Sequence, residues 1–298
     1  MDTSAFSDPY TDASLFKKTA RLGLTTLHRI LPARAYAAVY HPLFSIYQQL
    51  QRGQYRSKLN AARRAGDQDR VTCMQRVLKV MPHSLIGSPG LEHTHDLAEQ
   101  LVKQGVPGAF VECGVAQGGC AALIATVADS DPTERTCWFF DSFEGLPDPT
   151  SDDFADGETG RHIRPLPKGS CLGTIEQVSG LLFDDFQLSR DKITLVKGWF
   201  QDTLEPTRDQ IEAIALLRVD GDWYDSTKCC LEALFDQVSP GGQIIIDDYC
   251  SCYGAKRATD EFIANRDLQV KLLPDGRGGC SFQKPTNQDQ AMLERQVA

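Results

Sequence analysis

The sequence contains little that would mark a membrane-spanning, secreted or nucleic-acid-binding protein. No apolar run reaches the roughly 18 residues that a transmembrane helix needs. The start, MDTSAFSDPYTDASLF, lacks the basic residues and the apolar core of a signal peptide. Lys and Arg number 31 against 40 Asp and Glu, so the net charge of −9 provides no basic field for phosphates. We therefore expect no membrane span and no nucleic-acid partner.

Several cysteine and glycine motifs are also missing. The 10 cysteines include no CxxC pair, because Cys250 and Cys252 stand one residue too close together for that motif. Most cysteines lie in apolar segments, where a free thiol behaves as a small hydrophobic side chain. The sequence therefore favours a reducing, cytoplasmic compartment over a disulfide framework. The GxGxxG dinucleotide fingerprint and the P-loop lysine are absent too, which disfavours a pyrophosphate ligand.

From residue 109 onward, the sequence shows a regular alternation of apolar runs and helical segments. Within a run, apolar residues do not alternate with polar ones, which is typical of strands buried on both faces. The predicted strands lie within 109–115, 136–145, 192–200, 213–222, 241–249 and 279–284, with helices within 118–130, 226–240 and 255–266. Strands joined by helices predict right-handed crossovers and a doubly wound, mostly parallel α/β sheet.

The length of the chain sets its domain organisation. With 298 residues, 41% of them hydrophobic, it can form one buried core and an appendage. We expect a main domain over 81–285 and a C-terminal tail over 286–298. Inside the domain, residues 147–175 are rich in Pro, Gly and Asp and show no core periodicity. A loop of that length is usually a lid or a binding loop; a disordered surface insertion is the alternative.

Residues 1–80 differ from the rest of the chain. Their apolar residues follow a helical spacing that is broken at Pro32 and Pro42, and residues 57–81 are helical and basic. Such helices could cap the sheet, form a dimer surface or lie on a membrane face. We interpret residues 1–80 as a helical extension that packs on the sheet or on a second subunit.

Acidic residues follow two of the predicted strands. Asp220 ends the run LLRVD, and Asp247 and Asp248 end the run QIIIDD. Because ligands bind beyond the carboxyl ends of parallel strands, we expect these carboxylates to meet at one edge of the sheet. Three unpaired carboxylates at close range would repel one another strongly. A hard divalent cation would relieve this repulsion, and oxygen ligands favour Mg²⁺. The alternative is that Asp247 and Asp248 only cap the following helix and that Asp220 forms a salt bridge with a lysine. For the helix before it, we expect Asp225 or Ser226 as the cap.

A glycine-rich turn follows the first predicted strand, in VECGVAQGG. Glu112 ends that strand, and Gly114 begins a GxxxGG turn that lets a ligand approach the backbone. S-adenosylmethionine suits this acidic turn better than a dinucleotide does, because it has no phosphates and its sulfonium and amino groups are cationic. Asp141 ends the second strand, where it could accept hydrogen bonds from a ribose. The alternatives are a turn without a ligand and, for Asp141 or Ser142, a helix cap.

Five segments, in this order, resemble the macrocin O-methyltransferase family: FVECGVAQGG, FFDSFEGLP, KGWFQDTL, LRVDGDWYDST and PGGQIIIDDY. The resemblance covers roughly residues 80–283, whereas residues 1–100 and the 147–175 loop show no such match. It implies a Rossmann-like class I methyltransferase sheet with an antiparallel last strand. It also implies S-adenosylmethionine- and Mg²⁺-dependent methylation of a sugar hydroxyl on a natural product.

The same resemblance implies a set of site residues. Asp220, Asp247 and Asp248 would hold the metal, and the cofactor site would contain Ser84, Glu112, Gly114, Asp141, Ser142 and Trp199. Ser84 stands where the family usually has a threonine, so a hydroxyl is kept. Trp199 lies in GWFQD, which is the segment expected beside the adenine.

Our hypothesis for the reaction gives Asp220 two roles. The cation would lower the pKa of the acceptor hydroxyl, and Asp220, one of its ligands, would take the proton. Asp222 is a candidate to support the metal ligands. His162, in the 147–175 loop, is a second candidate base that we leave out of the site, because a lone loop histidine is more often incidental.

The expected acceptor is a small molecule or glycoside, and the expected assembly is a homo-oligomer. Two other interpretations remain open at this point. One is an NAD(P)-dependent sugar oxidoreductase, against which the missing GxGxxG counts. The other is a non-catalytic S-adenosylmethionine-binding protein.

Overall fold

The computed structural model describes residues 22–286, apart from residues 25, 28–29, 158 and 161–170. Its centre is a seven-stranded sheet with the order β3-β2-β1-β4-β5-β7-β6. The strands are β1 Ala109–Cys113, β2 Cys137–Asp141, β3 Ile193–Lys197, β4 Ile214–Val219, β5 Val238–Ile246, β6 Leu273–Pro274 and β7 Cys280–Gln283. The first five strands pair in parallel, and β7 runs antiparallel to β5. The predicted sheet is therefore confirmed; only β6 was not predicted.

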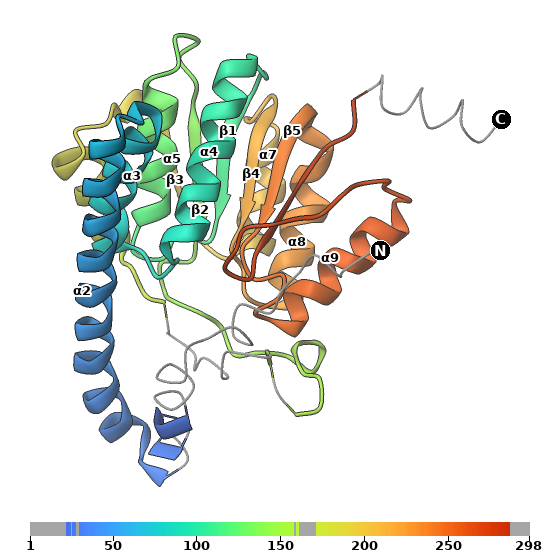
Figure 1. The fold of residues 1–298 in the computed structure, drawn as a ribbon. Helices are drawn as coiled ribbons and strands as arrows, with labels where there is room; N and C mark the ends of the chain where they lie inside the picture. Colours follow the sequence, from blue (N-terminus) through green and yellow to red (C-terminus); the bar gives the residue numbers. More distant parts are fainter. Residues whose placement is uncertain (1–21, 25, 28–29, 158, 161–170, 287–298) are drawn as a thin grey trace.

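Helices cover both faces of the sheet (Figure 1). On one face lie α3 Gln68–Val80, α4 Ser88–Gln104 and α5 Gly119–Asp129; on the other lie α7 Phe200–Arg208, α8 Tyr224–Leu234 and α9 Tyr253–Asn265. One apolar core fills each interface between sheet and helices. The short elements are η1 Met81–His83, η2 Ser151–Asp153, α6 Ile175–Ser179, η3 Gly180–Asp185, η4 Arg190–Lys192 and η5 Phe235–Gln237. The sequence did not predict α4 or α7.

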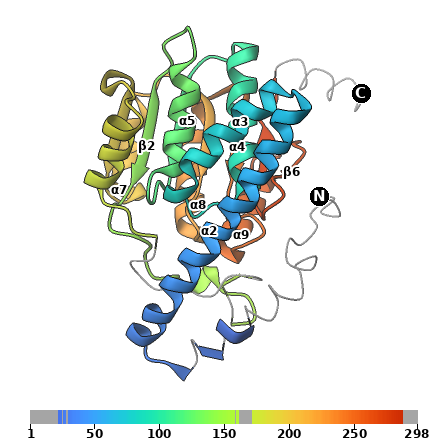
Figure 2. The same cartoon turned by 60° about the vertical axis from the view of Figure 1, so that its left-hand side comes forward.

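The N-terminal extension is dominated by one long helix, α2 Ala33–Ala65 (Figure 2). It begins after Pro32, as predicted, but it continues through Pro42, so the predicted break there is wrong. A proline in a helix removes one backbone donor and bends the helix, which the neighbouring turns can tolerate. The segment 57–81, expected to be helical, forms the end of α2 and the whole of α3, because α2 ends at Ala65 and its C-cap Gly66 has φ 75°. α3 then starts from Asp67, whose side chain accepts a hydrogen bond from Arg70 N.

Within the described part of the chain, no helix combines the length and the hydropathy that crossing a membrane requires.

Candidate active site

The three predicted metal ligands lie together at the carboxyl edge of the sheet. Asp220 follows β4, and Asp247 and Asp248 follow β5, which is the neighbouring strand. Asp247 N donates to Val219 O at 3.0 Å, so the two strand ends stay in register up to the site. One carboxylate oxygen from each aspartate lies within 4.8 Å of the other two. The structure thus brings the three side chains to one point, as the rule for parallel strands requires.

Two arginines that the sequence did not reveal pair with these carboxylates. Arg218, fully buried in β4, donates to Asp220 Oδ2 at 2.9 Å and to Asp247 Oδ1 at 2.6 Å. Arg277, in the β6–β7 hairpin, donates to Asp247 Oδ2 at 2.8 Å. The premise that all three carboxylates are unpaired is therefore wrong for Asp220 and Asp247. Guanidinium groups relieve part of the repulsion.

The electrostatic environment separates the three aspartates. Burial acts to raise the pKa of Asp247, but the two arginines outweigh it and hold that pKa below its usual value. Burial raises the pKa of Asp220, and Asp247 adds to the effect. The pKa of Asp248 is raised well above its usual value by burial and then by nearby carboxylates, foremost Asp222. Burial also raises the pKa of Asp222 well above its usual value, and Asp220 adds to it. Joint ionisation of Asp220, Asp222 and Asp248 is therefore unfavourable unless a cation lies beside them.

A hard divalent cation fits this donor set. The buried Oδ2 of Asp248 has no hydrogen-bond partner in the described structure, which is costly for a carboxylate unless a ligand supplies one. The surrounding acidic side chains outnumber the two guanidinium groups; they are Glu112, Asp220, Asp222, Asp247 and Asp248. Oxygen-only ligation with excess negative charge is the environment that Mg²⁺ prefers.

Glu112, predicted at the cofactor site, lies inside the sheet. Glu112 in β1 pairs in register with Arg218 in β4, and Glu112 Oε1 accepts a hydrogen bond from Arg218 Nη1 at 2.9 Å. Burial raises the pKa of Glu112 to about 8, although the guanidinium works against this. The second oxygen, Oε2, is buried without a hydrogen-bond partner among the described residues. Glu112 therefore also contacts the metal side of the site, through Arg218, in addition to its predicted place beside the cofactor.

Gly114 and Asp141 shape the turn after β1. Gly114 has φ 94°, and a Cβ on it would lie 1.9 Å from Asp220 O, so the close approach that requires glycine is to β4. Asp141 Oδ2 accepts hydrogen bonds from Val115 N at 2.7 Å and Ala116 N at 3.0 Å, and Oδ1 accepts one from Phe143 N. The Asp141 carboxylate thereby fixes the backbone of the turn at the sheet edge.

The other predicted cofactor residues border the same edge. Ser84 is buried next to the glycine turn, where a Cβ on Gly119 would touch it, and its Oγ accepts a hydrogen bond from Ile86 N. Ser142 forms a tight turn after β2, in which its Oγ donates to Gly145 O at 3.2 Å. Trp199 precedes α7 at the end of β3 and is half-buried. Strands β3, β2, β1, β4 and β5 thus bring the predicted site residues to one edge, apart from Ser84, which lies between η1 and α4.

The described part of the 147–175 loop is anchored by a buried carboxylate that sequence reasoning missed. Asp153 Oδ1 accepts a hydrogen bond from Tyr224 N at 2.6 Å, at the start of α8, and Oδ2 accepts one from Thr150 N. The prediction that Asp225 or Ser226 caps α8 is therefore wrong. The N-cap residue is Trp223, whose side chain makes no capping hydrogen bond, and Asp153 supplies the acceptor instead. His162 lies outside the described residues.

Gly254 in α9 packs against Asp153 of the loop, so we expect a larger residue at this position to destabilise the fold. A Cβ at this position would lie 2.0 Å from Asp153 Oδ1 and 2.6 Å from Tyr224 N. We expect Gly254→Ala to lower the free energy of unfolding by about 1–3 kcal/mol, measured by urea denaturation. The matched control is Gly53→Ala in α2, where a Cβ meets nothing within 4 Å and alanine should stabilise by up to about 1 kcal/mol. Equal effects of the two substitutions would contradict the tight packing at Gly254.

One Tyr-x-x-x-Lys pair, the spacing associated with sugar oxidoreductases, does occur at Tyr224 and Lys228. The Tyr224 hydroxyl donates to Glu261 Oε2 at 2.6 Å, and Lys228 Nζ lies 5.6 Å from the centre of the Tyr224 ring. The phenol therefore joins α8 to α9 and does not provide an acid–base group for an oxidoreductase.

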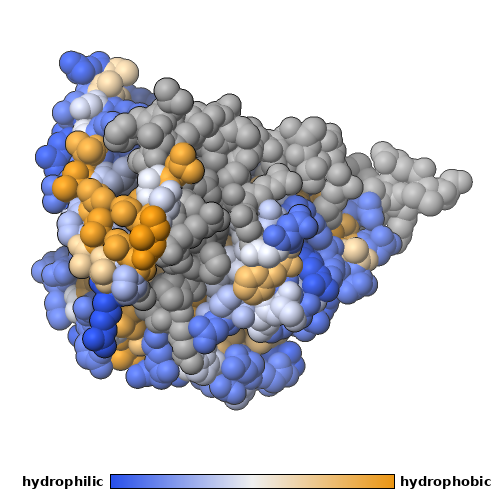
Figure 3. Space-filling model, turned by 90° about the horizontal axis from the view of Figure 1, so that it is seen from below, coloured by the Kyte–Doolittle hydropathy of each residue, from blue (hydrophilic) through white to orange (hydrophobic). Residues whose placement is uncertain are grey.

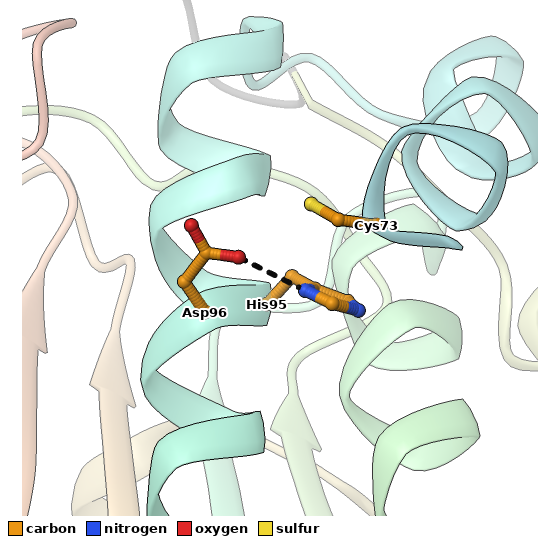
Figure 4. A group of neighbouring side chains, drawn as sticks. All are labelled: Cys73, His95 and Asp96. Carbon is orange, nitrogen blue, oxygen red and sulfur yellow. Dashed lines mark hydrogen bonds and ion pairs between the residues drawn. The ribbon is translucent and has the colours of Figure 1, made fainter. Parts of the chain in front are cut away.

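A second group of possible metal ligands, Cys73, His95 and Asp96, lies between α3 and α4 (Figure 4). Nε2 of His95 is 3.1 Å from Arg76 Nη1, which can only donate, so Nδ1 carries the proton and donates to Asp96 Oδ1 at 3.2 Å. Burial raises the pKa of the Cys73 thiol to about 12. Because both ring nitrogens are engaged and the thiol stays protonated, we assign this group to the packing of α3 on α4.

Comparisons with known proteins agree with this architecture. The family model of macrocin-O-methyltransferase (TylF) matches residues 23–280. The match includes α2 and α3, so the expectation that residues 1–100 have no counterpart is wrong from residue 23 onward. Demethyldecarbamoylnovobiocin O-methyltransferase of Streptomyces niveus is 37% identical over 204 residues, which are 68% of this chain and 76% of that protein.

Two further comparisons extend the agreement. The 8-demethyl-8-(2,3-dimethoxy-alpha-L-rhamnosyl)-tetracenomycin-C 4'-O-methyltransferase of Streptomyces olivaceus is 38% identical over 172 residues, covering 56% of this chain and 62% of that protein. The solved structure of the O-methyltransferase NovP superposes with a TM-score of 0.61 at 34% identity, covering 68% of this chain and 82% of that one.

The family match spans the catalytic sheet and the helices before it, and the relatives are named as O-methyltransferases. The expected Rossmann-like class I O-methyltransferase is thereby confirmed, and this chain belongs to the macrocin O-methyltransferase family.

Proposed function

We propose that this chain transfers the methyl group of S-adenosylmethionine to a hydroxyl of a sugar on a small-molecule glycoside, with the aid of a divalent cation. The observation that carries the proposal is the convergence of Asp220, Asp247 and Asp248 beside the glycine turn, with Asp248 Oδ2 lacking a partner in the described structure. The sugar acceptor is supported by the name of a relative, a 4'-O-methyltransferase of a rhamnosyl-tetracenomycin.

The cofactor half of the site is assigned to the edge formed by β1, β2 and β3. Asp141 holds the turn at Val115 and Ala116, so the backbone that would face the cofactor is fixed before binding. We assign Ser84, Glu112, Gly114, Asp141, Ser142 and Trp199 to this half, as the resemblance implies. Because Gly114 itself packs against β4, its role is to set the distance between the cofactor and the aspartates.

The acceptor half is assigned to Asp220, Asp247 and Asp248, which would hold Mg²⁺. When bound, the cation would lower the pKa of the acceptor hydroxyl and fix its orientation. In the transfer, a bond forms between the hydroxyl oxygen and the methyl carbon, the sulfur–methyl bond breaks, and the hydroxyl proton passes to a carboxylate. Asp220 is the base expected from the sequence. Its Oδ2 already accepts from Arg218, whereas no hydrogen bond or ion pair from Asp222 to a cationic side chain is found among the described residues, so we add Asp222, expected from the sequence only as a support for the metal ligands, as a further candidate base.

The direct test is a transfer assay with the purified chain. We expect incubation with S-adenosylmethionine, Mg²⁺ and a panel of small glycosides to give products heavier by one methylene group, with S-adenosylhomocysteine formed in equal amount. Mass spectrometry of both products checks this. Cofactor binding by calorimetry without transfer to any acceptor would favour a non-catalytic binding protein. A nicotinamide cofactor co-purifying with the chain would favour the oxidoreductase alternative.

A cytoplasmic location and a homo-oligomeric state are parts of the same proposal. The location is supported by the 10 cysteines, because many free thiols are typical of a reducing compartment.

A further inference from the structure

A second group of possible cation ligands lies at the carboxyl edge of the sheet, and we call it the thiol group of the site: Asp222, Asp248 and Cys252. Figure 3 shows the molecule from the side to which the carboxyl ends of the strands point. One carboxylate oxygen of each aspartate and the sulfur of the cysteine lie within 4.8 Å of one another. The thiol group shares Asp248 with the proposed Mg²⁺ ligands, but it adds a sulfur atom that the Mg²⁺ site lacks.

Three segments of the chain bring these ligand atoms together. Asp222 lies in the turn between β4 and α8, and Asp248 directly follows β5. Cys252 is the N-cap residue of α9, and its backbone N–H donates to Asp248 O at 2.9 Å. This turn of the backbone keeps the thiol next to the aspartate, and Cys252 Sγ lies 4.0 Å from Asp222 Oδ1. The thiol itself is only 1% exposed, so water competes little for it.

The carboxylates of the thiol group have bonding capacity that the described residues do not use. Asp248 is only 7% exposed, and its Oδ2 has no hydrogen-bond partner in the described structure. No hydrogen bond or ion pair joins Asp222 to a cationic side chain among the described residues, because Arg218 and Arg277 both pair with Asp247 instead. A buried carboxylate oxygen without a donor is costly. A cation is therefore missing beside Asp222 and Asp248, on the part of the cluster that the arginines leave unpaired.

The donor atoms indicate which cation fits. A thiolate is a soft ligand that favours Zn²⁺ over Mg²⁺, and zinc sites with three protein ligands leave a fourth position to water. In a tetrahedral site, with sulfur at about 2.3 Å and oxygen at about 2.1 Å from the ion, these two ligand atoms are about 3.6 Å apart. The 4.0 Å between Cys252 Sγ and Asp222 Oδ1 is close to that separation, so a small rotation of the side chains suffices.

We propose that Asp222, Asp248 and Cys252 form a second cation site, which takes Zn²⁺ or another thiophilic divalent ion. On binding, a bond forms between the ion and the sulfur of Cys252, and the thiol proton passes to water. The two oxygens of Asp248 allow it to serve this site and the Mg²⁺ site at once. Binding of the ion does not depend on the proposed reaction.

The effect of the ion on methyl transfer rests on the proposed function. An ion at the second site would hold Asp222, which is a candidate base, and would place a positive charge next to the Mg²⁺ ligands. We therefore expect Zn²⁺ to inhibit transfer. Cys252→Ala should require at least about tenfold more Zn²⁺ for half inhibition, because it removes the ligand that distinguishes Zn²⁺ from Mg²⁺.

The test of the site itself is spectroscopic and uses Co²⁺ as a probe that stands in for Zn²⁺. Co²⁺ bound to a thiolate gives a charge-transfer band in the near ultraviolet, which a site with oxygen ligands alone does not give. The full-length chain, without an affinity tag, should show this band, and Zn²⁺ should abolish it by displacing Co²⁺. The band should be absent in Cys252→Ala. It should persist in Cys73→Ala, the matched control, because Cys73 is also a buried thiol with an aspartate nearby.

A second substitution keeps the test informative if Cys252→Ala folds poorly. Asp222 is half-buried, so Asp222→Asn is expected to fold, and it should raise the dissociation constant for Zn²⁺ at least about tenfold, measured by calorimetry. Asp225→Asn makes the same chemical change at an exposed position of α8 and should leave the constant within about twofold.

Three results would overturn the second site: a wild-type chain without the charge-transfer band, a band that persists in Cys252→Ala, or an unchanged affinity for Zn²⁺ in Asp222→Asn. The charge-transfer band and the calorimetry need no methyl transfer. A chain that shows the band but transfers no methyl group would therefore contradict the proposed function and support the site.

Discussion

Replacing Arg218 with methionine should lower the free energy of unfolding by about 3–5 kcal/mol, measured by urea denaturation in EDTA. Arg218 is fully buried and donates to Glu112, Asp220 and Asp247 at distances between 2.6 and 2.9 Å. Methionine fills much of the volume but supplies no charge, so three carboxylates lose their shared partner in a low-dielectric environment. Breaking a buried ion pair from one side is costly because the remaining charge stays buried.

The matched control for Arg218 is Arg257→Met. Arg257 also pairs with two carboxylates, on Asp152 and Glu261, but its side chain is 51% exposed. Exposed pairs contribute up to about 1 kcal/mol, so this substitution should change the free energy of unfolding by no more than that. Mg²⁺ should restore part of the stability lost in Arg218→Met, because the cation would offset the unpaired carboxylates. Equal losses for the two substitutions would refute the central role of Arg218.

Much of the fold could be predicted because the sheet leaves a direct trace in the sequence. Five parallel strands buried between helices appear as apolar runs without alternation, and the acidic residues at their ends mark the carboxyl edge. Helices α4 and α7 left a weaker trace: α4 starts at Ser88-Pro89-Gly90, and Pro206 lies inside α7. Prolines and glycines suggest turns, and only tertiary packing decides whether the helix forms around them.

Only those site residues that directly follow a predicted strand could be found from the sequence. Arg218 stands out as a charged residue inside an apolar run, but its partners Glu112 and Asp247 are 106 and 29 residues away in the sequence. Nothing local marks Arg277 or Asp153, because each acts on an element from another part of the chain. Strand-end reasoning thus finds the carboxylates, whereas the cations that balance them depend on strand order and register.

Replacing Asp248 with asparagine should lower kcat by about 10²–10³-fold while making the metal-free protein more stable. Asparagine keeps the shape of the side chain but removes the charge of one proposed metal ligand, and metal-ion catalysis is worth several kcal/mol. In EDTA, the same change removes a buried carboxylate whose pKa is raised by burial and by Asp222, so the free energy of unfolding should rise by on the order of 1 kcal/mol. Activity assays with Mg²⁺ and urea denaturation in EDTA check the two effects.

Asp248 is a cleaner probe than its neighbour Asp247, because Asp247 also holds Arg218 and Arg277 and its loss would disturb both. Asp225→Asn is the matched control: it makes the same chemical change at an exposed position of α8 and should leave kcat within about twofold. Mg²⁺ should stabilise the wild type by mass action and should stabilise Asp248→Asn much less. Normal turnover in Asp248→Asn, or equal stabilisation of both proteins by Mg²⁺, would rule out Asp248 as a ligand. Opposite signs for activity and stability would show that the carboxylate is kept for its ligand and not for the fold.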